Sequence, residues 1–251
     1  MNTFSKGLDK RIERYWSQRA QGFGEVRRYE LAGEKRRLWL NEIEPFLPSG
    51  RLRILDVGTG TGFFAVLMTE LGHAVTGIDL SPSMIDSARE TAQRENISID
   101  FRVMGVERLD LPTEGFDVVL SRNLTWTLPD ARAAYADWHR VLRPGGVLIN
   151  FDADYGKVSF AQQTEELDQP NAHAAIGDAL LRECDAIKAQ LDISGVPRPE
   201  WDMRTLEEAG FEDIRCDTRI SDRIYAEVDE AFNPVPMFRL TARKQGAAHS
   251  L

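Results

Sequence analysis

Short apolar runs alternate with amphipathic stretches through the middle of the chain. The apolar runs predict buried strands at residues 53–57, 74–79, 99–103, 116–121 and 147–152. The amphipathic stretches predict helices at residues 62–71, 82–94 and 129–142. Ser81 and Pro82 have the side chains preferred at the N-cap and first position of the second of these helices. This alternation predicts an α/β fold with a doubly wound, mostly parallel sheet that has helices on both faces.

The two ends of the chain depart from this alternation, and they divide it into four predicted units. The first 48 residues have aromatic side chains at helical spacing and predict two helices that cover the site. Residues 50–155 form the predicted α/β core, and residues 156–200 a helical insertion, or lid, over the strand ends. Residues 201–245 predict a last helix and an antiparallel strand pair, which brings the sheet to seven strands.

Composition limits the function classes. The 251 residues are 42% hydrophobic and 28% charged, as in ordinary globular proteins. No apolar run approaches the roughly 20 residues that cross a bilayer, and the first 25 residues lack a signal-peptide pattern, so we expect a cytoplasmic protein without a membrane partner. Cys184 and Cys216 have no metal-ligand spacing, and we expect no metal.

The charge of the chain argues against a nucleic-acid partner. The formal net charge is −9, which repels a phosphate backbone. Residues 1–40 are the exception, with ten Lys and Arg against five Asp and Glu. This excess fits either a solvated helical face or an anion-binding patch.

A glycine-rich turn follows the first predicted strand. Residues 54–62 read Ile-Leu-Asp-Val-Gly-Thr-Gly-Thr-Gly, and glycines at 58, 60 and 62 let a flat ligand lie against bare backbone. The alternatives are a plain glycine turn and a dinucleotide site, because Gly60-x-Gly62-x-x-Ala65 also satisfies the loose dinucleotide fingerprint.

Two carboxylates near this turn favour a nucleoside without phosphates. Asp56 lies two residues before the first glycine, where it would repel a pyrophosphate but attract an ammonium group. Asp79 ends the next strand, where a carboxylate can accept both ribose hydroxyls. A ribose and an ammonium group without phosphates describe S-adenosylmethionine.

At this point the sequence resembles the class I S-adenosylmethionine-dependent methyltransferases of the small-molecule type, which have a Rossmann-like fold. The resemblance covers residues 50–152 and rests on four segments in the family's order and spacing. They are the glycine turn, Asp79-Leu-Ser-Pro-Ser-Met-Ile85, Phe116-Asp-Val-Val119 and Trp138-His-Arg-Val-Leu-Arg-Pro-Gly-Gly146.

The resemblance implies a cofactor site at the strand ends. Its residues would be Asp56, Gly58, Gly60, Asp79, Leu80, Met84, Val106, Glu107 and Arg122. The glycines would line the methionine portion, Asp56 would act near its amino group and Asp79 would bind the ribose. Leu80 and Met84 would flank the adenine, with Val106 and Glu107 at its edge. The sequence departs from the family at Gly105, where the usual acidic residue that meets the adenine amino group is missing.

The N-terminal Tyr15-Trp-Ser-Gln-Arg-Ala20 resembles the helix that many small-molecule members fold over the cofactor. Tyr15 and Arg19 lie one helical turn apart, so both could reach the methionine carboxylate. The alternative is an amphipathic helix that packs Trp16 and Phe23 in the core.

The implied activity is transfer of a methyl group to a small-molecule acceptor. The reaction is an in-line displacement at an activated carbon, so the protein mainly aligns the reactants in a dry pocket. The acceptor-side candidates after the fourth and fifth strands are Asn123, Trp126, Asp152 and Tyr155, and Trp16 of the N-terminal segment is a further candidate. If a general base is needed, the candidates are Asp152, Asp154 and His173; the two aspartates could equally cap a loop, and Trp126 could belong to the core.

Other functions stay open at this point. A non-catalytic S-adenosylmethionine-binding sensor or partner would fit Gly105 and the lack of an obvious base. A nicotinamide-dependent oxidoreductase would fit the loose dinucleotide fingerprint. We expect a monomer or homodimer whose N-terminal helices and lid enclose the acceptor.

Overall fold

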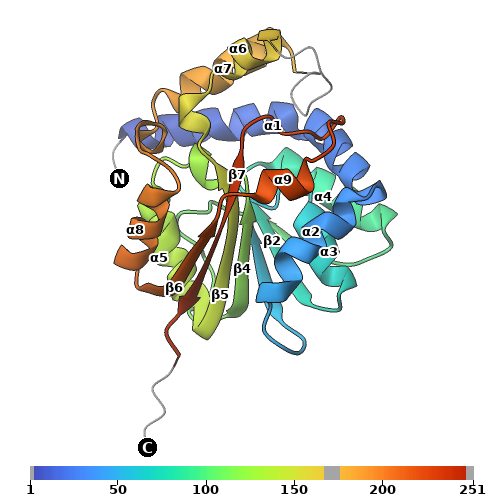
Figure 1. Cartoon of the computed structure of the whole chain (residues 1–251), viewed down its shortest axis with the longest axis vertical. Coiled ribbons are helices and arrows are strands. Elements are labelled where there is room, and N and C mark those ends of the chain that lie inside the picture. The colour runs from blue at the N-terminus through green and yellow to red at the C-terminus, as the bar shows by residue number, and fades with distance from the viewer. Residues whose placement is uncertain (1–2, 167–175, 247–251) are drawn as a thin grey trace, which may run out of the picture.

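The computed structural model describes residues 3–166 and 176–246, and a seven-stranded sheet forms its centre (Figure 1). The strand order is β3-β2-β1-β4-β5-β7-β6. Strand β7 pairs antiparallel with β5 and with β6, and the other neighbouring pairs are parallel. The strands are β1 (Arg53–Val57), β2 (Ala74–Asp79), β3 (Asp100–Val103), β4 (Phe116–Arg122), β5 (Leu142–Ala153), β6 (Phe211–Asp217) and β7 (Met237–Lys244). The predicted doubly wound, mostly parallel fold is confirmed.

The central strands are buried on both faces, which explains their continuous apolar sequences. In β4 the first six residues are buried, and in β1 only Arg53 is exposed. The chain crosses from β3 at one edge back to β4 beside β1, so the order reverses between β1 and β4. Ligands of such sheets bind outside the carboxyl ends of the strands at this reversal.

Helices cover both faces of the sheet (Figure 1). One face carries α2 (Lys35–Ile43), α3 (Phe63–Glu70) and α4 (Pro82–Arg94), and the other carries α5 (Ala131–Val141) and α8 (Glu200–Glu208). The side chain of Ser81 caps α4 by accepting a hydrogen bond from the Met84 amide, as its sequence position predicted.

A long N-terminal helix closes the end of the sheet where the ligand crevice is expected. Helix α1 (Thr3–Ala32) runs through Gly22 and Gly24 without a break and lies across the carboxyl ends of the strands (Figure 1). Above it lie α6 (Phe160–Glu166) and α7 (Asp178–Lys188), of which α7 contacts α1.

Two short helices have no counterpart in the sequence-based assignment. They are α6 and, after β6, α9 (Ile220–Ile224). In the last predicted unit, residues 201–245, strand β6 ends at Asp217 and α9 begins at Ile220. In the predicted helical insertion, residues 156–200, the described α-helices are α6 and α7.

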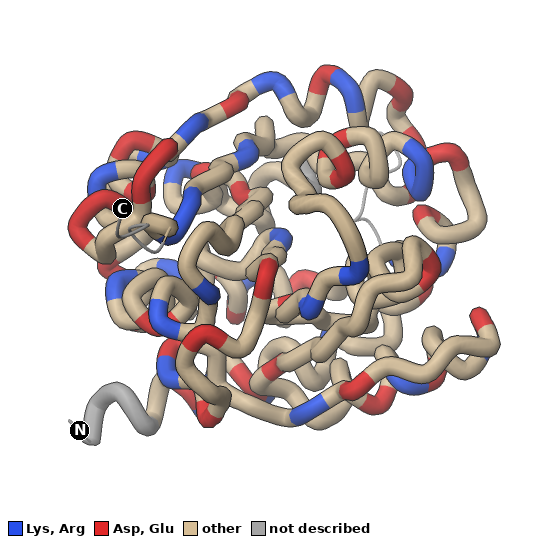
Figure 2. Tube along the Cα trace, turned by 90° about the horizontal axis from the view of Figure 1, so that it is seen from below, with Lys and Arg blue, Asp and Glu red and all other residues tan. Residues whose placement is uncertain are grey.

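Lys and Arg are interspersed with Asp and Glu along the chain trace (Figure 2). Basic residues among the first 40 form ion pairs with acidic residues of other elements: Arg11 with Glu183 at 2.6 Å, Lys35 with Asp229, and Arg36 with Glu70. The N-terminal excess of basic residues is therefore partly neutralised by the fold. Within the described chain no helix is long and apolar enough to cross a membrane, and no cluster of three His, Cys, Asp or Glu side chains could hold a metal ion.

Candidate active site

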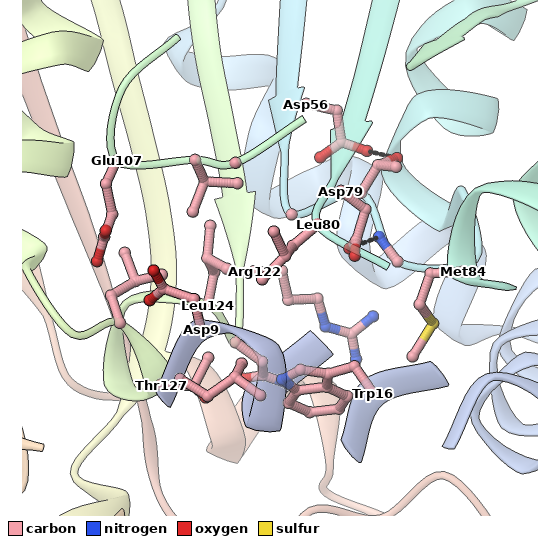
Figure 3. A pocket seen from close by; sticks show the side chains of 18 of the residues that line it. Asp9, Trp16, Asp56, Asp79, Leu80, Met84, Glu107, Arg122, Leu124 and Thr127 are labelled. Carbon is pink, nitrogen blue, oxygen red and sulfur yellow. Dashed lines mark hydrogen bonds between the residues drawn. The ribbon is translucent and has the colours of Figure 1, made fainter. Parts of the chain in front are cut away.

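A cavity of about 450 Å³ opens at the carboxyl ends of β1, β2 and β4, under α1 (Figure 3). This volume lies within the range of small-molecule sites, roughly 300–1,000 Å³. We call it the large cavity. Its lining includes most of the residues expected at the cofactor, namely Asp56, Gly58, Gly60, Asp79, Leu80, Met84, Val106, Glu107 and Arg122. Trp16 and Asn123, which were expected at the acceptor, line it as well.

The glycine turn after β1 forms part of this lining with bare backbone. Gly58 has a φ of +66°, and a Cβ atom there would lie 2.7 Å from the side chain of Leu124. Such a contact is closer than real Cβ atoms allow, so only glycine fits under Leu124. Hydrogen bonds from the Thr59 amide to Ile78 O and from the Gly60 amide to Asp79 Oδ2 fix the turn to the end of β2.

Asp56 is a carboxylate buried beneath the turn. It accepts a hydrogen bond of 2.6 Å from Thr59 Oγ1. Burial raises its pKa to about 7, although the hydrogen bond from Thr59 opposes that shift. No described cation pairs with it. An ammonium group in the large cavity would therefore favour the ionised form of Asp56.

Asp79 is held at the end of β2 by backbone donors. Its carboxylate accepts from the Gly60 amide at 3.0 Å and from the Ser81 amide at 2.9 Å. Burial raises its pKa to about 6. Asp79 lies close to Asp56 (Figure 3), and further lone pairs of its carboxylate can accept hydroxyl groups of a ligand.

The large cavity also has apolar surfaces and acidic groups besides Asp56 and Asp79. Leu80, Met84 and Val106 provide the apolar surfaces. Glu107 accepts a hydrogen bond of 2.6 Å from the Asp130 amide, and Asp9 of α1 lies nearby (Figure 3). Burial raises the pKa of Glu107, and the negative charge of Asp9 adds to this effect.

The position of Gly105 is open, because a Cβ atom there would meet nothing within 4 Å. Asp9, Glu107 and Asp130 are the acidic groups near Glu107 in the lining of the large cavity, and Asp130 caps α5 by accepting a hydrogen bond from the Ala133 amide. Sequence reasoning missed Asp9, since only the course of α1 brings it there.

Two guanidinium groups of the large cavity share one buried carboxylate. Arg122 donates two hydrogen bonds to Glu30 of α1, at 2.8 and 3.0 Å, and Arg27 pairs with the same group. Burial alone would raise the pKa of Glu30, but Arg122 and then Arg27 lower it to about 2. The cluster carries one net positive charge. Sequence reasoning named Arg122 but missed Arg27, whose i,i+3 spacing to Glu30 was the available signal.

A second, smaller cavity of about 40 Å³ adjoins the large one. The two share Trp16, Phe23, Arg27 and Asn123. The rest of its lining is mostly aromatic or polar and, among the described residues, includes no Asp or Glu: Tyr15, Arg19, Trp126, Tyr155, Phe160, Leu181, Cys184, Tyr225, Ala231 and Asn233. We call it the aromatic cavity.

The structure places two of the residues predicted at the cofactor apart from the others. Tyr15 and Arg19, expected at the cofactor, line the aromatic cavity and not the large one. Trp126 and Tyr155, expected at the acceptor, line the aromatic cavity as well. His173 lies outside the described residues.

The structure places Asp152, which was predicted on the acceptor side, in the lining of neither cavity. Its side chain is fully buried and accepts hydrogen bonds from the hydroxyl of Thr125, the amides of Trp126 and Ala153, and the guanidinium of Arg198. These donors occupy its oxygens, so the structure gives Asp152 a role in joining β5 to the segment before α8.

Asp154 also lies away from both cavities. It forms an ion pair of 2.6 Å with Lys157. The alternative interpretation, that the two aspartates after β5 are structural, therefore describes their contacts better than a role as general base.

Part of the chain matches a known protein family. Residues 55–150 match the family described as methyltransferase domain. Residues 55–150 are a class I methyltransferase domain. The resemblance predicted from the sequence is thus confirmed, and the cofactor of the domain is S-adenosylmethionine.

Curated relatives match mainly over this methyltransferase domain. A ubiquinone biosynthesis O-methyltransferase of Paramagnetospirillum magneticum is 39% identical over 102 residues, which are 41% of this chain and 41% of that protein. A malonyl-[acyl-carrier protein] O-methyltransferase of Serratia marcescens is 35% identical over 97 residues, 39% of this chain and 36% of that protein. The match thus spans about two fifths of these relatives.

Solved structures share the fold over most of the chain. Phospholethanolamine N-methyltransferase 2 of Haemonchus contortus is 17% identical, with a TM-score of 0.65, and the match covers 98% of this chain and 61% of that one. An S-adenosylmethionine-dependent methyltransferase of Mesorhizobium loti is 21% identical, with a TM-score of 0.56 over 82% of this chain and 98% of that one. At these identities the likeness concerns the fold alone.

Proposed function

We propose that the chain transfers a methyl group from S-adenosylmethionine to a small-molecule acceptor. The observation that carries this proposal is the pair Asp56 and Asp79 at adjacent strand ends, beside a glycine turn in a cavity of about 450 Å³. Asp79 has lone pairs that can accept two ribose hydroxyls. Asp56 has no cationic partner among the described residues, and the ammonium group of the ligand would supply one. The match to curated O-methyltransferases adds support.

The residues of the large cavity fit each part of this cofactor. Asp56 would hold the methionine ammonium group and Asp79 the ribose. The positive charge shared by Arg27 and Arg122 would attract the methionine carboxylate. Leu80 and Met84, which lie on one side of the cavity, would contact the faces of the adenine.

The adenine amino group would meet Asp9 or Glu107. Both carboxylates lie near the open position of Gly105, where the family has its usual acidic residue. In this proposal Asp9 or Glu107 takes the role of that acidic residue. Asp9 does so from α1, a different element of the chain.

The chain would act mainly by positioning. When bound, the cofactor supplies a methyl group on a positively charged sulfur. Helix α1 covers the strand ends and excludes water, which strengthens electrostatic interactions inside the site. The aromatic cavity adjoins the large cavity through Trp16 and Asn123, so an acceptor there would face the cofactor.

Partners and location follow from the sequence in this proposal. The net charge of −9 supports an acceptor other than a nucleic acid. A cytoplasmic location and a monomeric or homodimeric state stay predictions.

Calorimetry with S-adenosylhomocysteine tests the cofactor site. We expect a micromolar Kd for the wild type and a loss of at least about 30-fold in Asp79→Ala, because hydrogen bonds to a charged acceptor contribute about 1.5–3 kcal/mol each. Asp86→Ala, which removes an exposed carboxylate of α4, is the matched control. Absence of binding to the wild type would refute the proposal.

Methyl transfer is tested with cofactor labelled in the methyl group and an extract of small metabolites. Label in the small-molecule fraction is the expected result. Binding without any transferred label would favour a non-catalytic sensor. Stabilisation against heat by NADH, but not by S-adenosylhomocysteine, would favour an oxidoreductase.

A further inference from the structure

Arg19 is a buried cation that has no counter-ion among the residues that the structure describes. Its side chain comes from α1 and lines the aromatic cavity, and the residue is 8% exposed. Its one hydrogen bond in the described chain is a donation to Tyr15 Oη, at 2.8 Å. No described Asp or Glu forms an ion pair with it, although other buried arginines such as Arg122 and Arg198 have carboxylate partners.

The neighbours of Arg19 do not supply the missing negative charge. Burial raises the pKa of Tyr15 far above neutrality, and burial raises the pKa of the Cys184 thiol to about 11. Both groups are therefore neutral at pH 7. Glu30 is shared by the guanidinium groups of Arg27, which lines the cavity, and Arg122. Asp185, whose charge acts on Cys184, forms an ion pair with Lys188.

An unpaired guanidinium at such a site favours an anionic ligand. A buried charge is costly unless it is paired, and arginine does not lose its proton to avoid that cost. The planar fork of its N–H groups matches a carboxylate, with which it forms two parallel hydrogen bonds. A cationic acceptor would instead be repelled by Arg19 and Arg27.

The walls of the aromatic cavity favour a flat ligand. The ring of Trp126 lies 4.9 Å from Tyr155, 6.1 Å from Trp16 and 5.8 Å from Phe160, measured between centroids. The space of about 40 Å³ takes a group the size of about three waters, as a carboxylate is. The rest of the ligand would extend toward Trp16 and Asn123, where the large cavity begins.

We propose that the methyl acceptor is a small, planar organic anion whose carboxylate is bound by Arg19. The proposal rests on the function proposed above and specifies its substrate class. The described residues that line the aromatic cavity include no Asp or Glu, so no carboxylate of that lining competes for Arg19.

Titrations with three probes of similar shape test this proposal. Benzoate, benzamide and benzylamine differ mainly in charge, and their Kd values are measured with saturating S-adenosylhomocysteine by calorimetry and tryptophan fluorescence. We expect benzoate to bind at least about tenfold more tightly than benzamide, and benzylamine to bind weakest. Equal affinity for benzoate and benzamide, or no binding of benzoate, would overturn the proposal.

Variants of Arg19 assign the preference to this side chain. Arg19→Met should abolish the preference for benzoate, and Arg19→Lys should keep part of it. The Kd of S-adenosylhomocysteine should change less than about twofold in both, which also reports that the variants fold. Arg14→Met, the same change at an exposed position of α1, is the matched control.

The outcomes separate the two proposals. If Arg19→Met weakens S-adenosylhomocysteine binding and leaves the benzoate preference unchanged, Arg19 serves the cofactor and the present inference is wrong. The titrations are also run without S-adenosylhomocysteine. Suppose that the protein does not bind S-adenosylhomocysteine but still prefers benzoate, and that this preference depends on Arg19. That result would support the anion site and refute the methyltransferase function.

Discussion

The protonation of Asp56 should control cofactor affinity near neutral pH. Its pKa of about 7 in the ligand-free protein results from burial. A methionine ammonium group beside it would lower this pKa, so binding should release a proton. Affinity for S-adenosylhomocysteine should then rise as the pH rises, because the ionised form of Asp56 is the form that binds.

The size of the effect follows from the titration of the carboxylates. At pH 5.5 only about 3% of groups with a pKa of 7 are ionised, against roughly 75% at pH 7.5, so Asp56 alone predicts about a 25-fold gain in affinity. Asp79, with its pKa of about 6, adds about fourfold if its ionised form accepts the ribose hydroxyls.

Calorimetry across pH 5.5–7.5 measures this dependence in the wild type and in Asp56→Asn. The variant should keep only the shallower, roughly fourfold change that Asp79 contributes. At pH 6.5, titrations in two buffers of different ionisation enthalpy should show proton release in the wild type and less in the variant. A wild-type affinity that is flat over this range, or an equal slope in Asp56→Asn, would refute the reasoning.

Three further predictions concern stability. Glu30→Gln should lower the free energy of unfolding by about 3–5 kcal/mol in urea denaturation, since it leaves Arg27 and Arg122 facing each other without a carboxylate; a loss below about 1 kcal/mol would contradict the buried cluster. Gly58→Ala should lower the melting temperature and weaken S-adenosylhomocysteine binding, because its Cβ would meet Leu124 at 2.7 Å, and an unchanged Tm and Kd would disprove that close approach. The free energy of unfolding of the ligand-free protein should fall as the pH rises from about 4 to 7, because Asp56 has a higher pKa in the folded than in the unfolded chain; Asp56→Asn should flatten this slope, and an identical slope would count against the raised pKa.

Local sequence signals were enough for the elements that build the cofactor side of the site. The bounds of β1 and β2 agree with the predicted ranges, because apolar runs in a parallel sheet are bounded by polar residues or glycine. Helix α4 also begins where Ser81 and Pro82 predicted. The short helices α6 and α9 were missed, since a few residues carry too little periodicity to identify a helix.

The acceptor side depended on contacts between distant segments. Asp152 was predicted at the acceptor, but the structure shows its carboxylate bonded to Arg198, which is 46 residues away along the chain. Arg19 was expected with Tyr15 at the cofactor, and the helical spacing of the two was right, but only the packing of α1 against α7 places them in the aromatic cavity. Hydrophobic periodicity predicts which side chains share one face of a helix. It does not predict which other element that face packs against.

A crystal structure of the protein with S-adenosylhomocysteine tests the central claim most directly. The account predicts the ligand in the large cavity, with its ribose hydroxyls on Asp79 and its ammonium group beside Asp56. An empty cavity at saturating ligand, or a ligand bound elsewhere with neither carboxylate in contact, would contradict it.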